Sequence, residues 1–161
     1  MTTRTDGPIR QHVLELLKGG HAHVTFDQAV EDLPARVRGV RPHEGVHSPW
    51  ELLEHLRLAQ WDILEFSRDP NHESPEFPDG YWPATPEPPD EAAWDESVRA
   101  FRRDFRALCD LVADESVDLF VPIPQGDGQT VLREALVAAD HQAYHLGELV
   151  IVRRLLGAWK S

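Results

Sequence analysis

The sequence is poor in cysteine, in long apolar segments and in positive charge. Its 161 residues include one cysteine, Cys109, which excludes an internal disulfide and any zinc site built from several cysteines. Cys109 lies in an apolar helical pattern, so we interpret it as a small core residue, with a reactive thiol as the less favoured alternative. The length and the 41% hydrophobic content predict a single folded domain, residues 1–161.

The lack of long apolar segments and the shortage of positive charge limit where the protein can be located and which partners it can bind. No apolar run approaches the roughly 20 residues that a membrane span needs, and the N-terminal MTTRTDGPIR lacks the apolar region of a secretory signal. We therefore expect a cytoplasmic protein without a membrane partner. Lysine and arginine number 16 against 28 aspartates and glutamates, a net charge of −12, which repels phosphate backbones. Nucleic acid is therefore not an expected partner.

The patterns that are present are helical, and no strand alternation of convincing length occurs. Thr25 with Gln28, and Ser48 with Glu51, have the spacing of a capping box. The predicted helices cover 8–18, 25–38, 48–66, about 90–112 and 130 to about 159. Pro34 predicts a kink or an early stop in the second segment.

The third of the long helices carries apolar residues at steps of four and three, the packing pattern of an antiparallel bundle: Trp94, Val98, Phe101, Phe105, Leu108 and Val112. Residues 67–90 hold seven prolines and no periodicity, so we predict a long loop there. The predicted fold is all-α, a four-helix bundle with a split first helix and a long Pro-rich loop between helices two and three.

Nine histidines are present, and six of them lie at helix ends or in turn-rich segments. We interpret these six as surface residues: His12, His21, His23, His43, His47 and His72. The remaining three fall inside apolar stripes, where His55 shares a helix face with Leu52 and Ile63. His141 and His145 lie four residues apart on the inward face of the last helix, one above the other.

Three inward imidazoles on two helices would need three separate polar partners, because an unpaired buried polar group costs about 1–3 kcal/mol. One divalent metal ion satisfies all three together, by the ligand logic of a helical histidine pair completed by a residue from another helix. We therefore predict a metal site formed by His55, His141 and His145. The alternative of polar core histidines beside a small-molecule pocket stays open.

Glu148 lies three residues after His145 on nearly the same face. It is the candidate catalytic residue, as a general base or as a carboxylate partner of a histidine ligand. Three polar residues adjoin a predicted ligand in the sequence, namely Glu54, Asp140 and Gln142. Because successive residues of a helix point in different directions, we expect all three to be exposed.

The segments HSPWELLEHLRLAQWDIL and ADHQAYHLGELVIVRRLLGAW, together with the GYWP loop, resemble the DinB-like and YfiT-like bundle proteins. The resemblance covers nearly the whole chain, and HxxxHxG[EQ] is its most specific part. It implies a divalent metal, often nickel or zinc, held by the residues that match the family motif, His55, His141 and His145. It also implies homodimers and metal-dependent S-transferases or isomerases that use a low-molecular-weight thiol.

Three hypotheses of function follow. In the first, an open metal position activates a thiol cosubstrate or a water, so that the protein is an S-transferase or a hydrolase acting on a small molecule. In the second, the metal is sequestered, sensed or structural in a non-catalytic or stress-response protein. In the third, no metal binds. Phe77, Tyr81 and Trp82 either form a pocket wall or anchor the loop to the bundle, and the sequence favours neither.

Overall fold

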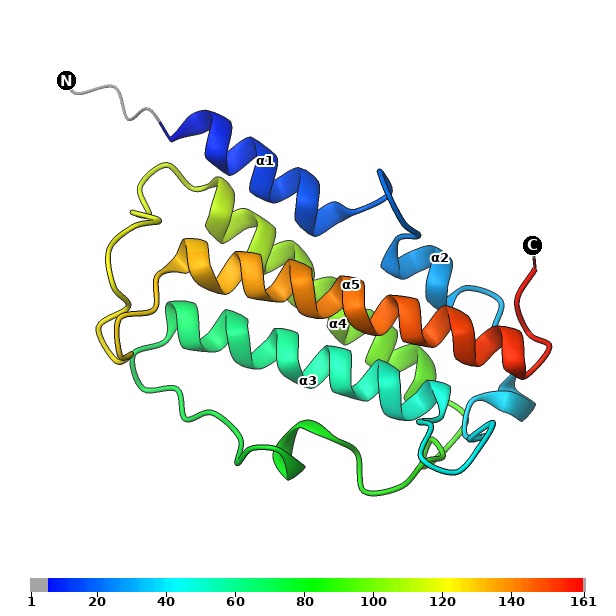
Figure 1. Ribbon diagram of the computed structural model, residues 1–161. Helices are drawn as coiled ribbons and strands as arrows, with labels where there is room; N and C mark the ends of the chain where they lie inside the picture. Colours follow the sequence, from blue (N-terminus) through cyan, green and yellow to red (C-terminus); the bar gives the residue numbers. More distant parts are fainter. Residues whose placement is uncertain (1–5, 161) are drawn as a thin grey trace.

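The computed structural model describes residues 6–160, and these form helices with a single isolated β-bridge, between Pro122 and Thr130 (Figure 1). The five α-helices and two 3₁₀ turns are, in chain order, α1 (Gly7–Lys18), α2 (Phe26–Val30), η1 (Ala35–Val37), α3 (Pro49–Arg68), η2 (Asp79–Tyr81), α4 (Ala93–Ala113) and α5 (Val131–Leu155). The prediction of an all-α fold is confirmed.

Side chains cap free backbone N–H groups at the starts of α2, α3 and α5, where the sequence predicts helices to begin. The Ser48 hydroxyl accepts from the backbone N–H of Glu51, whose carboxylate accepts from the Ser48 N–H. Thr25 and Gln28 make the same reciprocal pair at α2, and the Thr130 hydroxyl accepts from the Arg133 N–H at α5. Two of these caps fix the first residues of α3 and α5, the helices that carry the three histidines.

Two predicted helix ends are wrong. The second segment was expected to reach about Arg38, but α2 ends at Val30 and the chain continues in a separate 3₁₀ turn. Asp32 has a positive φ of 53°, and Pro34 lacks the N–H that a helix needs and restricts the residue before it. The last helix ends at Leu155 instead of Trp159, shortly before Gly157 with φ 66°.

Helices α3, α4 and α5 form the centre of the bundle. Helix α3 packs against α4 and α5, α1 packs against both α4 and α5, and the short α2 packs on α5. The predicted apolar row on α4 is buried, except that Phe105 is only partly covered. Helix α5 therefore has neighbours on several sides, which bears on both sites described below.

The apolar residues of α1 are only half buried. Val13 and Leu17 are 5% and 1% exposed, whereas Ile9 and Leu16 are 40% and 53% exposed. The charged residue Arg10 is 5% exposed and lies on the buried face. Arg10 donates hydrogen bonds to the Asp6 carboxylate and to the carbonyl oxygens of Val112 and Val117. A buried charge is tolerated there because it is paired and fully bonded.

The Pro-rich connection between α3 and α4 runs beside α3 (Figure 1) and contains the one-turn helix η2, which contacts α3. The loop was predicted without any regular turn, so η2 is an addition. Within residues 6–160, no helix combines the length and the apolar character of a membrane span.

Candidate metal centre

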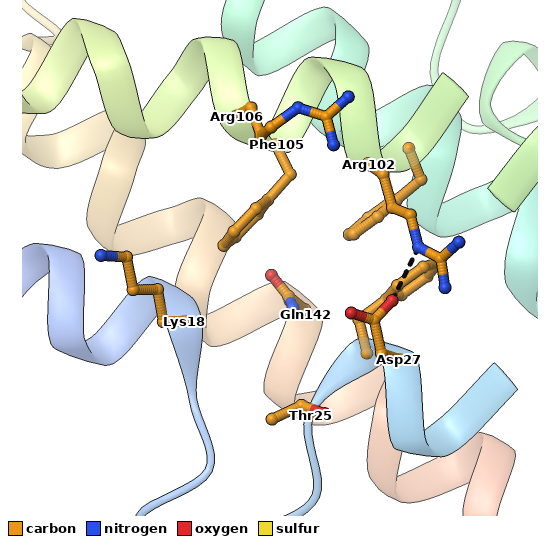
Figure 2. Close-up of a pocket in the computed structure, with 9 residues that line it drawn as sticks. Lys18, Thr25, Asp27, Arg102, Phe105, Arg106 and Gln142 are labelled. Carbon is orange, nitrogen blue, oxygen red and sulfur yellow. Dashed lines mark hydrogen bonds and ion pairs between the residues drawn. The ribbon is translucent and has the colours of Figure 1, made fainter. Parts of the chain in front are cut away.

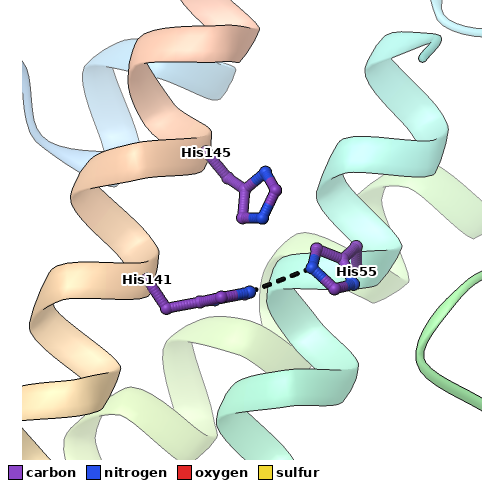
Figure 3. A group of neighbouring side chains, drawn as sticks. All are labelled: His55, His141 and His145. Atoms are coloured by element: carbon purple, nitrogen blue, oxygen red, sulfur yellow. Dashed lines mark hydrogen bonds between the residues drawn. The ribbon is translucent and has the colours of Figure 1, made fainter. Parts of the chain in front are cut away.

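Three histidine side chains converge between α3 and α5 (Figure 3). His55 comes from α3, and His141 and His145 come from successive turns of α5. One ring nitrogen of each lies within 4.8 Å of those of the other two. His55 and His145 are 9% and 8% exposed, and His141 is half-buried. The residues that the sequence selected as ligands are therefore brought together at one point.

The His55 ring is oriented by a backbone carbonyl of the Pro-rich loop. Its Nδ1 lies 2.8 Å from the carbonyl oxygen of Tyr81, which can only accept, so Nδ1 carries the proton and donates. In the neutral ring this leaves the Nε2 lone pair facing the other histidines. Burial lowers the pKa of His55, which favours this neutral form.

The His145 ring is oriented by Glu148, one turn further along α5. His145 Nδ1 donates to Glu148 Oε2 at 2.9 Å, which leaves Nε2 of His145 for the cluster. The other carboxylate oxygen, Oε1, accepts from Nδ1 of His47 at 3.3 Å. These two hydrogen bonds, that from His145 above all, lower the pKa of Glu148. Of the two predicted roles for Glu148, this geometry is that of a carboxylate partner of a histidine.

His141 completes the cluster through a contact between ring nitrogens. Its Nε2 lies 2.9 Å from Nε2 of His55. Since the proton of His55 is on Nδ1, His141 is the donor of this hydrogen bond. Burial, together with the neighbouring His145 and His55, lowers the pKa of His141 to about 4, so the ring is neutral near pH 7. To serve as a metal ligand through Nε2, His141 would carry its proton on Nδ1 instead.

The donor set fits a divalent transition metal. In a tetrahedral zinc site with Zn–N distances of about 2.0–2.1 Å, the ligand nitrogens lie about 3.4 Å apart. Here the closest pair is 2.9 Å apart and all three nitrogens lie within 4.8 Å of one another. The required separation lies between these two values. Histidine ligands usually donate their second N–H to a carbonyl or carboxylate, as His55 and His145 do.

Trp82 covers one side of the cluster. Its ring stacks on His55 with a centroid distance of 3.8 Å and an interplanar angle of 1°, and on His47 at 4.1 Å. Of the three loop aromatics, Trp82 thus forms a wall of the site, whereas Phe77 is 83% exposed. Tyr81 anchors the loop, because its hydroxyl donates to Asp62 Oδ2 at 2.7 Å.

The interpretation of six histidines as surface residues is wrong for His72 and incomplete for His47. The His47 side chain is 38% exposed, but it also packs against Trp82 and bonds to Glu148. The side chain of His72 is 7% exposed and lies 2.7 Å from Asp62 Oδ1, so that Asp62 holds two loop residues at once. No local signal could have found the His47 contact, since it joins positions 101 residues apart.

The neighbours of the ligands only partly follow expectation. Asp140 is exposed, as predicted, but Glu54 is not, because its carboxylate bonds to Arg57 and to the Ser97 hydroxyl. The expectation that Gln142 is exposed is also wrong, because this residue is only 7% exposed. Half-burial of Cys109 raises the pKa of its thiol to about 11, which agrees with the packing role over the reactive one.

Comparison with protein families gives a match to the model of the DinB superfamily over residues 21–149, which include all three histidines and Glu148. The comparisons with curated proteins and with solved structures gave no significant match.

Proposed function

Because this chain belongs to the DinB superfamily, we propose that it is a metal-dependent enzyme that joins a low-molecular-weight thiol to an electrophilic small molecule. Its metal would be a divalent transition ion, zinc or nickel, held by the Nε2 atoms of His55, His141 and His145. The observation that carries the proposal is the convergence of three imidazoles, two of which have their other nitrogen engaged by a hydrogen-bond acceptor.

Held by three neutral imidazoles, such an ion would lower the pKa of a bound thiol or water toward neutrality. In the transfer, the thiol sulfur forms a bond to the electrophilic carbon, the leaving group departs with its electron pair, and the thiol proton passes to solvent. Cys109 is not among the converging groups, so the thiol comes from the small-molecule cosubstrate. With water in place of the thiol, the same arrangement supports hydrolysis.

The residues around the histidines have roles that can be assigned from their contacts. Glu148 is a positioning residue, since it holds His145 in the tautomer with Nε2 free. The Tyr81 carbonyl does the same for His55, and Asp62 fixes Tyr81 by its hydroxyl. The stacked rings of Trp82 and His47 exclude water from one side of the cluster, which strengthens electrostatic interactions within it.

The alternative function is non-catalytic metal binding, as in a sequestering or stress-response protein. Structural zinc sites usually close with four protein ligands. The cluster of described residues offers three, and Glu148 is directed to His145 and His47. This favours a site with an open position, and therefore catalysis, over a closed structural site.

The decisive experiment combines metal content with transfer activity. Protein purified without a polyhistidine tag should hold roughly one equivalent of zinc or nickel, and His55→Ala should lose it, because each ligand removed weakens binding steeply. His12→Ala, which removes an exposed histidine of α1, is the matched control. Activity is then measured with a panel of thiols and 1-chloro-2,4-dinitrobenzene, in which formation of the C–S bond changes the absorbance.

The outcomes separate the three hypotheses. Metal binding with thiol transfer that is lost in His55→Ala supports the enzyme. Full metal occupancy without turnover by any thiol, or by water on activated esters, supports the non-catalytic alternative. Metal content below about a tenth of an equivalent, not rescued by added zinc or nickel, excludes both metal hypotheses.

A homodimer is also part of the proposal. Helix α5 exposes a row of apolar side chains at helical spacing, namely Tyr144, Ile151 and Leu155, which are 73%, 52% and 54% exposed. Such rows often mark protein–protein contacts. Sedimentation of wild type as a dimer and of Ile151→Asp as a folded monomer would support it, and a monomeric wild type would exclude it.

A further inference from the structure

We propose that the bundle contains a second small-molecule site, separate from the histidines, that takes an aromatic carboxylate bearing a hydroxyl or other hydrogen-bond donor. It is a cavity of about 320 Å³ between α1, α2, α4 and α5 (Figure 2). Its size falls in the range of about 300–1,000 Å³ that is usual for small-ligand pockets. Three features define the ligand: an aromatic surface, an excess of positive charge and an unpaired buried amide.

The aromatic surface is formed by three phenylalanines. The rings of Phe26 and Phe101 stack with a centroid distance of 3.8 Å, and Phe105 lies nearly parallel to Phe101 at 6.3 Å. Phe26 and Phe101 are buried, whereas Phe105 is only partly covered although it belongs to the apolar row of α4. The uncovered part of Phe105 faces this cavity, so a flat apolar ring would complete the packing.

The positive charge comes from Lys18, Arg102 and Arg106. Asp27, the acidic residue of the lining, lies 2.7 Å from Arg102 and neutralises it. Lys18 and Arg106 are exposed and form no ion pair with any carboxylate in residues 6–160. The chain as a whole has a net charge of −12, so a cationic rim over an apolar cavity runs against the general surface and selects an anion.

The unpaired amide is that of Gln142, which is 7% exposed and whose side chain points into the space between the surrounding helices (Figure 2). Its Oε1 is buried and has no hydrogen-bond partner in the described part of the chain. Buried polar groups are almost always bonded, so an unpaired one in a cavity wall indicates a missing partner. Rotation about the terminal bond exchanges Oε1 and Nε2, and a phenolic hydroxyl can pair with either because it both donates and accepts.

This site does not overlap the metal centre. Its lining includes none of the three histidines. Gln142 follows His141 directly in α5, and successive residues of a helix are rotated by about 100° from each other, so the two side chains leave the helix in different directions. The proposal is therefore independent of the function proposed for the histidines.

The test uses the full chain and 4-hydroxyphenylacetate, which carries a ring, a carboxylate and a phenolic hydroxyl. Titration calorimetry should give saturable binding with Kd below about 1 mM. Phenylacetate, which lacks the donor, and 2-(4-hydroxyphenyl)ethanol, which lacks the charge, should each bind about threefold to tenfold more weakly, the usual contribution of one such contact.

Variants locate the binding. Gln142→Leu, of similar volume, and Arg106→Ala should each weaken 4-hydroxyphenylacetate about threefold to tenfold. Arg154→Ala removes the same charge from an exposed position about three turns after Gln142 on α5. This variant should bind 4-hydroxyphenylacetate as tightly as the wild type does. Far-UV circular dichroism and melting curves of each variant confirm that the fold is retained.

Two results would overturn the proposal. One is the absence of saturable binding up to about 10 mM, a concentration far above a useful affinity. The other is binding that disappears in His55→Ala or after removal of metal with a chelator but persists in Gln142→Leu and Arg106→Ala, since the carboxylate would then bind at the histidines. Binding that survives in metal-free His55→Ala and weakens in the two pocket variants supports it.

Discussion

Replacing Glu148 tests whether this carboxylate positions a ligand or transfers a proton. In Glu148→Ala, the Nδ1 of His145 loses its acceptor at 2.9 Å, and His47 loses a weaker one at 3.3 Å. The ring of His145 is then free to turn and to exchange tautomers, which removes the preorganisation of its Nε2. Glu148→Gln keeps an oxygen that can accept from His145 but loses the negative charge.

The size of the effect follows from the contacts. A hydrogen bond to a charged group contributes about 1.5–3 kcal/mol, and the Glu148 side chain is 29% exposed, which places it at the lower end. Since 1.4 kcal/mol corresponds to tenfold, Glu148→Ala should weaken metal binding about tenfold, and Glu148→Gln by about threefold. Asp140→Asn changes an exposed carboxylate on the same helix and should leave metal affinity unchanged.

Metal affinity is measured by competition with a chromophoric chelator, with the melting temperature of the metal-free protein as a check on folding. Where turnover is found, kcat and KM are measured at saturating metal across a range of pH. Wild-type metal affinity in Glu148→Ala, combined with loss of kcat and of its dependence on pH, would refute the positioning role and assign proton transfer to Glu148. Unchanged affinity and unchanged turnover would refute both roles.

Three further predictions concern the loop, the core and the titration of the site. Tyr81→Phe removes the hydroxyl that anchors the loop and should weaken metal binding about threefold to tenfold, whereas Phe77→Ala in the same loop should not, as competition with a chelator will measure. Leu149→Ala, at a fully buried position, should lower the free energy of unfolding by about 2–5 kcal/mol, against at most about 0.5 kcal/mol for the exposed Leu16→Ala in urea denaturation. In metal-free protein, burial gives His141 a pKa of about 4, so between that value and the usual one of about 6.5 the unfolded chain binds more protons than the folded chain. Stability should therefore fall as the pH drops through this window, by at most about 1.4 kcal/mol per unit for one proton, and His141→Leu should flatten the fall in urea titrations at several pH values.

Several parts of the fold could be predicted because the residues that determine them are neighbours in sequence. A Ser48–Glu51 capping box and the proline at the first position specify where α3 begins, and these residues are neighbours in sequence. The prolines of the 67–90 segment remove backbone donors whatever surrounds them. The error at α2 is local as well, since Pro34 was recognised and only the choice between a kink and a stop was left open.

The three inward histidines could be predicted for a related reason. An imidazole is a polar group in an otherwise apolar stripe, and the sequence pattern alone identifies such a residue at His55, His141 and His145. The convergence of three such positions required only that two amphipathic helices face each other. The resemblance to DinB-like proteins, which the family match confirms over residues 21–149, depended on the same positions.

The contacts around those histidines depended on the tertiary structure. The acceptor for His55 is a backbone carbonyl, which every residue has, so the side chain of Tyr81 contains no sign of it. The acceptor shared by His145 and His47 joins the start of α3 to the middle of α5. Sequence periodicity describes one helix at a time and holds no information on which turn of one helix lies beside which turn of another.

The sequence by itself determined that this chain is helical, where most of its helices begin, and which three imidazoles lie against the core. The tertiary structure alone decided that the Tyr81 carbonyl orients His55, that His47 joins Glu148, and that Gln142 is buried beside a cavity. The physical reason is the central position of α5, which α1, α2, α3 and α4 all contact. A helix covered from several sides buries polar residues outside its apolar stripe, so its burial is set by neighbours that come from distant parts of the chain.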